Sequence, residues 1–143
     1  MSVRPVRVGR SVTGLGLFAT KAIARRTTIV SYRGRRIPTA EARRRERRFG
    51  AKYMFELNRR WTIDGSPRWN LGRYANHSCR PNAEAIARKG RVVLVALRSI
   101  MAGEEITFDY GDEYFELFFK KSGCLCADCR GKAARRRSFA RRL

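Results

Sequence analysis

The chain is short of acidic residues and of histidine. It carries 12 Asp and Glu against 33 Lys and Arg, a formal net charge of +21, and a single histidine among its 143 residues. It also has no apolar run long enough to cross a membrane. The absence of such an apolar run argues against a membrane-spanning protein. Because positive charge attracts polyanions, we expect nucleic acid, a nucleoprotein or a strongly acidic protein surface as a neighbour.

The N-terminus has no apolar stretch of the kind that directs secretion. We therefore expect an intracellular and reducing setting, in which thiols stay reduced. A length of 143 residues suits one domain with a modest hydrophobic core.

The chain has only four cysteines, and one metal site can use all of them. Cys124, Cys126 and Cys129 form a C-x-C-x₂-C cluster, and Cys79 lies far upstream. A structural zinc ion takes four ligands and favours thiolates, so the set predicts one closed zinc centre that ties the C-terminal segment to the middle of the chain. Two alternatives stay open: a pair of disulfides, which a reducing setting disfavours, or a buried Cys79 that leaves the cluster to another ligand.

The basic residues are concentrated in two places. One is residues 130–143 at the C-terminus, and the other is a run at residues 43–48 that contains Arg43, Arg44, Arg45, Arg47 and Arg48. Such runs are often only a solvated helix face and a disordered tail. Clustering on this scale exceeds what solubility requires, so we also expect contact with nucleic acid or nucleoprotein through both places.

Short apolar runs broken by Gly, Asn and Pro favour many short strands. The helix-forming residues of 39–49, with Pro38 and Thr39 as start signals, predict one helix with a cationic exposed face, and residues 112–119 predict a second, short one. The fold class that follows is mainly β with a few short helices. The expected strands cover residues 28–32, 53–57, 61–63, 83–87, 91–97 and 105–110.

Several motifs occur in a specific order along nearly the whole chain. Together they resemble the SET-domain protein lysine methyltransferases with a zinc-binding post-SET segment. The resemblance implies a SET domain over residues 1–119, built of small curved β-sheets with a pseudoknot, and a post-SET zinc segment with a basic tail over 120–143. The motifs are Gly14-Leu15-Gly16-Leu17-Phe18-Ala19, Tyr32-Arg33-Gly34, Ala40-Glu41-Ala42-Arg43, Tyr53-Met54-Phe55, Gly72-Arg73-Tyr74-Ala75-Asn76-His77-Ser78-Cys79-Arg80-Pro81-Asn82, Gly103-Glu104-Glu105-Ile106-Thr107-Phe108-Asp109-Tyr110-Gly111 and the cysteine cluster.

By resemblance, the methyl donor is S-adenosylmethionine and the acceptor is a lysine side chain. Tyr110 and Tyr32 match the catalytic tyrosines, and Phe108 matches the position that sets how many methyl groups are added. The resemblance implies a substrate channel lined by Phe108, Tyr110 and Tyr53. It also implies a single structural Zn²⁺ held by Cys79, Cys124, Cys126 and Cys129. The implied cofactor-binding residues are Gly14, Leu15, Gly16, Tyr53, Arg73, Asn76, His77, for which we expect the backbone to matter more than the ring, and Leu125.

Phenylalanine at position 108 leaves room that a tyrosine hydroxyl and its bound water would fill, so we expect di- or trimethylation. Arg35 stands where relatives commonly carry an acidic residue, and the cysteine cluster is spaced more tightly than in many of them. Because a cationic enzyme repels a free cationic peptide, we expect a lysine of a histone, histone-like or ribosomal protein presented on nucleic acid.

Composition leaves the wider setting open. The chain can be a bacterial enzyme of the cytoplasm and nucleoid, or one delivered to a host nucleus and its chromatin, and it can be a monomer or a homodimer. The rival function is a catalytically inactive, zinc-stabilised nucleic-acid-binding module. That alternative explains the charge and the cysteines, but it gives no role to Gly16, Asn76 and Tyr110 together.

Overall fold

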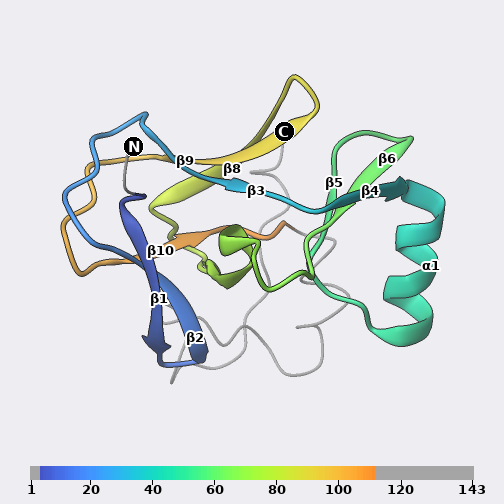
Figure 1. The fold of residues 1–143 in the computed structure, drawn as a ribbon, viewed down its shortest axis with the longest axis horizontal. Coiled ribbons are helices and arrows are strands. Elements are labelled where there is room, and N and C mark those ends of the chain that lie inside the picture. The colour runs from blue at the N-terminus through green and yellow to red at the C-terminus, as the bar shows by residue number, and fades with distance from the viewer. Residues whose placement is uncertain (1–3, 112–143) are drawn as a thin grey trace.

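The structure is a computed structural model that describes residues 4–111. This part of the chain contains three small sheets and one α-helix (Figure 1). The first sheet has the strand order β1-β2-β10-β7. Its members are β1 (Val6–Ser11), β2 (Gly14–Ala19), β10 (Glu105–Phe108) and β7 (Asn76–His77). The mainly β fold expected from the sequence is confirmed.

The second sheet is antiparallel and has the order β3-β9-β8. It consists of β3 (Thr28–Tyr32), β9 (Arg91–Ala96) and β8 (Ala83–Arg88), and the last two form a hairpin that turns at Lys89 and Gly90. Both of these turn residues have positive φ angles, of 52° and 74°, which a tight hairpin turn requires. All three strands were expected from their short apolar runs and from the turn residues Lys89 and Gly90 between the last two.

The third sheet has the order β4-β6-β5 and carries the helix. It consists of β4 (Arg35–Pro38), β6 (Trp61–Asp64) and β5 (Met54–Glu56). Gly34 lies between β3 and β4, where a Cβ atom would overlap the backbone carbonyl oxygen of Asp64. A side chain at this position would therefore push the second and third sheets apart.

Helix α1 (Thr39–Phe49) has the bounds that the sequence predicted. The hydroxyl of Thr39 does not cap the helix but lies 3.1 Å from the carbonyl oxygen of Asn58 and 2.9 Å from the hydroxyl of Thr62, which ties the helix start to β6. Gly50 ends the helix in the left-handed conformation, with φ of 64°. Only the side facing β6 is buried, so most of its arginines are exposed.

The main core lies between the first two sheets. Four side chains are fully buried there: Leu17 of β2, Leu94 of β9, Ile100 of the loop after β9 and Ile106 of β10. Burial of this size supplies most of the driving force for folding. No helix in the described part of the chain is long and apolar enough to cross a membrane.

Strand β7 is two residues long and pairs in parallel with β10, Asn76 opposite Thr107 and His77 opposite Phe108. The segments that the resemblance implies to cross in a pseudoknot therefore lie side by side, with β10 between β2 and β7 (Figure 1). The short 3₁₀ helix η1 (Leu71–Tyr74) leads into β7. The predicted helix over 112–119 and the zinc segment lie outside the described residues.

Candidate active site

A narrow cavity of about 40 Å³ collects the aromatic residues that the sequence predicted for the substrate channel. Their side chains come from β3, from β5 and the residue before it, from η1 and from the end of β10. Apart from one guanidinium group, the described walls carry no charged side chain. The lining residues are Tyr32, Tyr53, Met54, Phe55, Gly72, Arg73, Ala75, Phe108 and Tyr110.

The hydroxyl group of Tyr110 donates a hydrogen bond to the carbonyl oxygen of Ala75 at 2.7 Å. Its backbone N–H donates to Nδ1 of His77 at 3.1 Å, and its ring packs on that of Phe108 with centroids 4.8 Å apart. The bond to Ala75 and the ring packing fix the position of the phenolic oxygen at the wall of the cavity.

Tyr32 is 5% exposed, and its hydroxyl donates to the carbonyl oxygen of Tyr53 at 2.7 Å. The same carbonyl accepts from the backbone N–H of Gly65 at 2.8 Å, and Tyr53 has a positive φ angle of 69°, which is uncommon for a residue with a large side chain. The ring of Tyr32 packs on Phe55 and fills the space above Gly65, where a Cβ atom would overlap it. Tyr32 therefore forms a wall of the cavity and holds Tyr53 in place.

Arg73 lies between two aromatic rings, with its guanidinium carbon 4.3 Å from the centroid of Tyr53 and 5.3 Å from that of Tyr74. Its Nε is buried and has no hydrogen-bond partner among residues 4–111. An unpaired buried donor of a cationic group is costly, so this atom is suited to an acceptor, above all a carboxylate, that a ligand would bring.

Asn76 is held by a network that crosses the first sheet. Its Nδ2 donates to the carbonyl oxygen of Leu15 at 2.9 Å and to the carboxylate of Glu105 at 2.8 Å, and the other oxygen of this carboxylate accepts from Ser11 at 2.8 Å. A Cβ atom on Gly16 would lie 2.6 Å from the same carboxylate. The predicted cofactor residues 14–16 and Asn76 thus adjoin one another, and the missing side chain of buried Gly16 leaves room for the carboxylate of Glu105.

His77 is buried, and its ring has partners on both nitrogen atoms. Nδ1 accepts from the backbone N–H of Tyr110, so the ring proton lies on Nε2, which is 3.5 Å from the sulfur of Cys79. The carboxylate of Asp109 lies 3.8 Å from Nδ1. The ring therefore connects the predicted catalytic tyrosine with a predicted zinc ligand, a contact that sequence reasoning did not anticipate.

The predicted metal centre can be followed only at Cys79, which is half-buried. Cys124, Cys126, Cys129 and Leu125 lie outside the described residues. Within residues 4–111, no three His, Cys, Asp or Glu side chains are grouped closely enough to hold a metal ion. An N–H donor next to Cys79 suits a thiolate ligand, because metal-bound sulfur accepts such bonds.

Sequence reasoning missed two supporting residues, Glu105 and Asn82. Glu105 orients Asn76. Asn82 makes two hydrogen bonds to the β10 backbone: its Nδ2 donates to the carbonyl of Glu105 at 2.8 Å, and its Oδ1 accepts from the N–H of Thr107 at 2.9 Å. Both residues lie within the motifs that carried the resemblance. Their place in those motifs was the only signal in the sequence that pointed to them.

A second hollow, of about 190 Å³, adjoins the channel between α1 and β5. It shares Met54, Phe55 and Tyr110 with the channel, and two glutamates, Glu46 and Glu56, line it. Arg43 lines it as well and forms an ion pair with Glu56 at 2.8 Å, so the charges of this hollow are partly balanced within the chain.

A family model described as the SET domain matches residues 14–111. The histone-lysine N-methyltransferase, H3 lysine-4 specific, of Saccharomyces cerevisiae is 34% identical over 140 residues, which cover 90% of this chain and 13% of the relative. The histone-lysine N-methyltransferase set-2 of Caenorhabditis elegans is 36% identical over 138 residues, which cover 88% of this chain and 9% of the relative. The chain thus spans about a tenth of the length of these relatives.

Two solved structures have the same architecture. One is ctPRC2 in an autoinhibited conformation bound to S-adenosylmethionine, with a TM-score of 0.67 and 31% identity over 84% of this chain and 17% of that one. The other is a humanized mutant of the Chaetomium thermophilum Polycomb Repressive Complex 2 bound to the inhibitor GSK126, with a TM-score of 0.65 and 32% identity over 78% and 15%. Because the family model covers most of the chain and the folds agree, this chain belongs to the SET-domain family.

Proposed function

We propose that the chain transfers methyl groups from S-adenosylmethionine to lysine side chains of proteins. The observation that carries this proposal is the hydroxyl group of Tyr110, which is held by the carbonyl of Ala75 at the wall of a narrow aromatic cavity. Methyl transfer from a sulfonium to an amine is an in-line displacement that needs positioning more than acid or base groups. A rigid aromatic channel with one fixed phenolic oxygen supplies that positioning.

The cavity also favours the reactive form of the amine. A free lysine has a pKa of about 10.4, and only the neutral amine can attack a methyl group. Loss of water between the apolar walls disfavours the charged ammonium, and this desolvation lowers the pKa of a bound lysine. The described walls contain no carboxylate that would oppose this effect.

The donor fits beside the channel on three grounds. The unpartnered Nε of Arg73 suits the donor's carboxylate, and the missing Cβ of Gly16 leaves room for the Glu105 carboxylate that holds Asn76. Asn76 is fixed by Glu105 for hydrogen bonding, and when bound the donor supplies the electrophilic methyl group. These residues bind and orient the donor, while Tyr32, Tyr53, Phe108 and Tyr110 orient the acceptor.

We further propose that the target is a lysine of a histone or another protein bound to nucleic acid, on chromatin or a nucleoid. The names of the relatives specify histone lysines as their targets. A net charge of +21 repels a free cationic peptide but attracts a nucleic acid that carries the target protein.

The first test replaces Tyr110 with Phe. We expect methyl transfer to a histone mixture to fall by about a hundredfold or more, since the oxygen near the reacting atoms is lost, while S-adenosylmethionine affinity changes by less than about threefold. Radiolabelled transfer and calorimetry measure the two quantities. Unchanged turnover would remove Tyr110 from the mechanism, and the absence of cofactor binding by the unmodified chain would favour the inactive binding module.

The second test replaces Phe108 with Tyr. The ring of Phe108 is buried against Tyr110, so an added hydroxyl takes space at the end of the channel. We expect the unmodified chain to give di- or trimethyllysine and the variant to give mainly monomethyllysine, as mass spectrometry of the product would measure. Only monomethyl product from the unmodified chain would contradict the assignment.

The third test replaces Glu105 with Gln. An amide cannot accept from both Ser11 and Asn76 as the carboxylate does, so Asn76 loses its fixed orientation. We expect the Kd for S-adenosylmethionine to rise about tenfold or more, the usual cost of one charged hydrogen bond, with a smaller change in kcat. Glu84→Gln on β8 is the matched control and should leave the Kd unchanged. An equal effect of both variants would exclude a specific role for Glu105.

The fourth test concerns the zinc ion, which we propose is held by Cys79 with Cys124, Cys126 and Cys129. Elemental analysis should find one zinc per chain. A strong chelator should lower both the thermal midpoint and the turnover, because the metal would fix the segment that follows Tyr110, and added zinc should restore both. A metal-free chain with full turnover would refute this coupling.

A further inference from the structure

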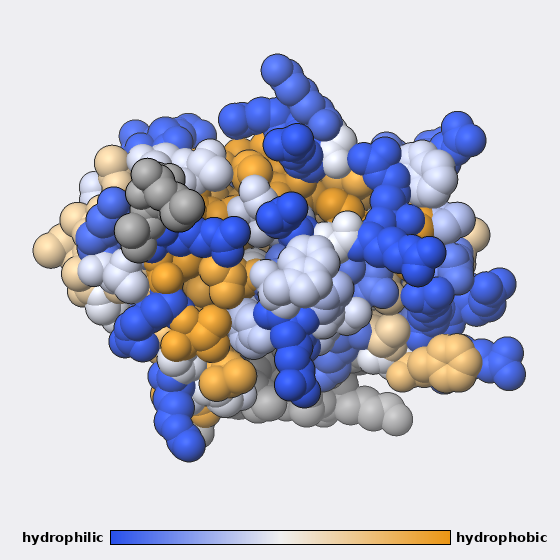
Figure 2. Space-filling view, in the orientation of Figure 1, coloured by the Kyte–Doolittle hydropathy of each residue, from blue (hydrophilic) through white to orange (hydrophobic). Residues whose placement is uncertain are grey.

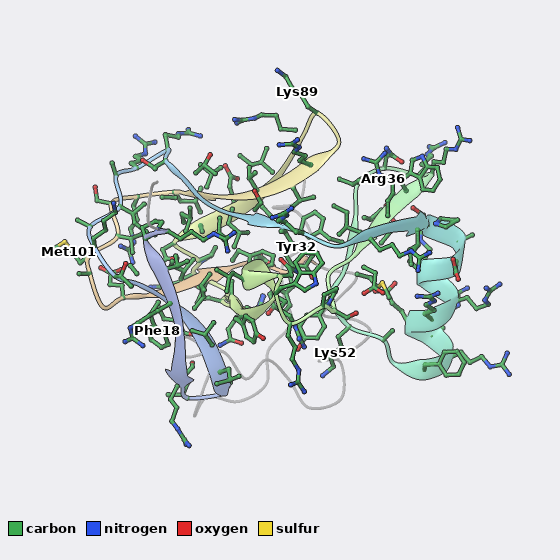
Figure 3. The ribbon with its side chains drawn as sticks, in the orientation of Figure 1. Phe18, Tyr32, Arg36, Lys52, Lys89 and Met101 are labelled. Carbon is green, nitrogen blue, oxygen red and sulfur yellow. The ribbon has the colours of Figure 1, made fainter. Side chains whose placement is uncertain are left out.

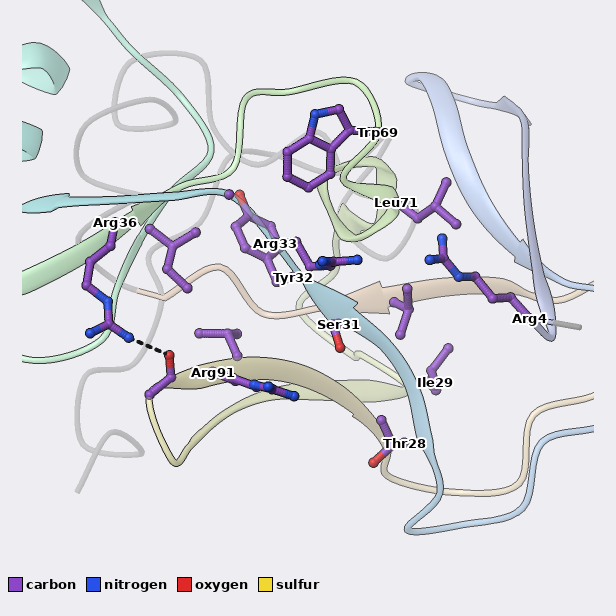
Figure 4. Close-up of a pocket in the computed structure, with 15 residues that line it drawn as sticks. Arg4, Thr28, Ile29, Ser31, Tyr32, Arg33, Arg36, Trp69, Leu71 and Arg91 are labelled. Atoms are coloured by element: carbon purple, nitrogen blue, oxygen red, sulfur yellow. Dashed lines mark hydrogen bonds between the residues drawn. The ribbon is translucent and has the colours of Figure 1, made fainter. Parts of the chain in front are cut away.

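A separate hollow of about 660 Å³ lies on the face formed by β3 and the β8–β9 hairpin (Figure 4). Four exposed arginines line it: Arg4 from the N-terminal segment, Arg33 after β3, Arg36 in β4 and Arg91 at the start of β9. In the space-filling view, hydrophilic side chains surround hydrophobic surface over β3 and β9 (Figure 2). The volume is in the range of clefts that hold small ligands, roughly 300–1,000 Å³.

The charge of this hollow is not compensated within the described residues. No aspartate or glutamate is among the residues that line it. None of the ion pairs found in residues 4–111 includes any of the four arginines, and Arg36 bonds only to the carbonyl oxygen of Gly90, at 3.1 Å. By contrast, two arginines of α1 form ion pairs, Arg43 with Glu56 and Arg45 with Glu41 and Asp64.

A large aromatic side chain completes the hollow. Trp69 is 61% exposed, and the guanidinium carbon of Arg33 lies 5.7 Å from the centroid of its ring (Figure 4). Exposure of so much of an indole is unfavourable in water, and its flat face is accessible to a partner. Tyr32 lies close to the centre of the fold (Figure 3), and it lines both this hollow and the channel.

We propose that this hollow binds single-stranded nucleic acid, with the four arginines on successive phosphates and Trp69 stacked on a base. Cationic grooves with an exposed aromatic ring are the usual means of holding single strands, because every base presents a flat face. In a duplex the bases are already stacked and paired, so Trp69 could not reach one without unstacking it. An acidic peptide would satisfy the arginines but leave the indole without a planar partner.

The proposal does not depend on methyl transfer, because binding is measured without cofactor or histone. Labelled oligouridine and oligothymidine are titrated with the full chain at several salt concentrations, and fluorescence anisotropy reports binding. The test variant is Arg33→Ala with Arg91→Ala. Its matched control, Arg44→Ala with Arg47→Ala, removes the same charge from exposed positions of α1. Thermal midpoints check that both variants fold.

We expect the hollow variant to reduce the slope of log K against log salt by about 1.4, since each phosphate contact on a single strand contributes about 0.7. The sequence predicted nucleic-acid contact for residues 43–48 as well, whereas this proposal assigns the main contact to the hollow, so the α1 variant should change the slope by less than half of that. An equal change in both would show that net charge alone is responsible and would overturn the proposal.

A second measurement follows Trp69 itself. Trp69→Ala should weaken binding by about fivefold or more, and Trp69→Phe by less, because stacking contributes about 1–3 kcal/mol per base. In a Trp61→Phe background, the emission of Trp69 should be quenched by oligouridine or oligothymidine. Binding by Trp69→Ala equal to that of the unmodified chain, or equal quenching by a DNA duplex or a glutamate-rich peptide, would overturn the assignment to a single strand.

Discussion

The parallel pairing of β7 with β10 is the constraint on which the site depends. Two residues, Asn76 and His77, lie against the strand that ends just before Tyr110, so the predicted donor-binding and catalytic residues are placed by the same backbone hydrogen bonds. A two-residue strand has little stability of its own. The pairing of β7 is supported by side chains, because Asn82 makes two hydrogen bonds to the β10 backbone and Glu105 accepts a hydrogen bond from Asn76.

Polar side chains, rather than apolar packing alone, give this region its order. Glu105 joins the β1–β2 hairpin to β7, and the ring of His77 joins Tyr110 to Cys79. Partly buried networks whose members all have partners are rigid, since any rearrangement leaves a polar group unsatisfied. Arg73 is an exception, because its buried Nε has no hydrogen-bond partner within residues 4–111. An acceptor group of a bound ligand would supply that partner.

Sequence patterns predicted helix α1 and the strands β3, β8 and β9, because their periodicity and turn residues are local properties. They did not predict β1, β2, β4 or β7. Arginine and glycine interrupt β1, β2 and β4, and β7 is too short to show alternation, so these strands exist only because partners pair with them. The pattern also missed the ring contacts of His77, which join residues 33 positions apart.

By itself the sequence determined the family and the mainly β class, and it predicted the aromatic residues that line the cavity, because motif order and residue chemistry are properties of the linear chain. Only the tertiary structure decided that Tyr32, Tyr53, Phe108 and Tyr110 line one cavity, and that four arginines from separate segments surround Trp69. Both arrangements rest on contacts between distant positions. Such contacts depend on how the three sheets pack, which no local pattern specifies.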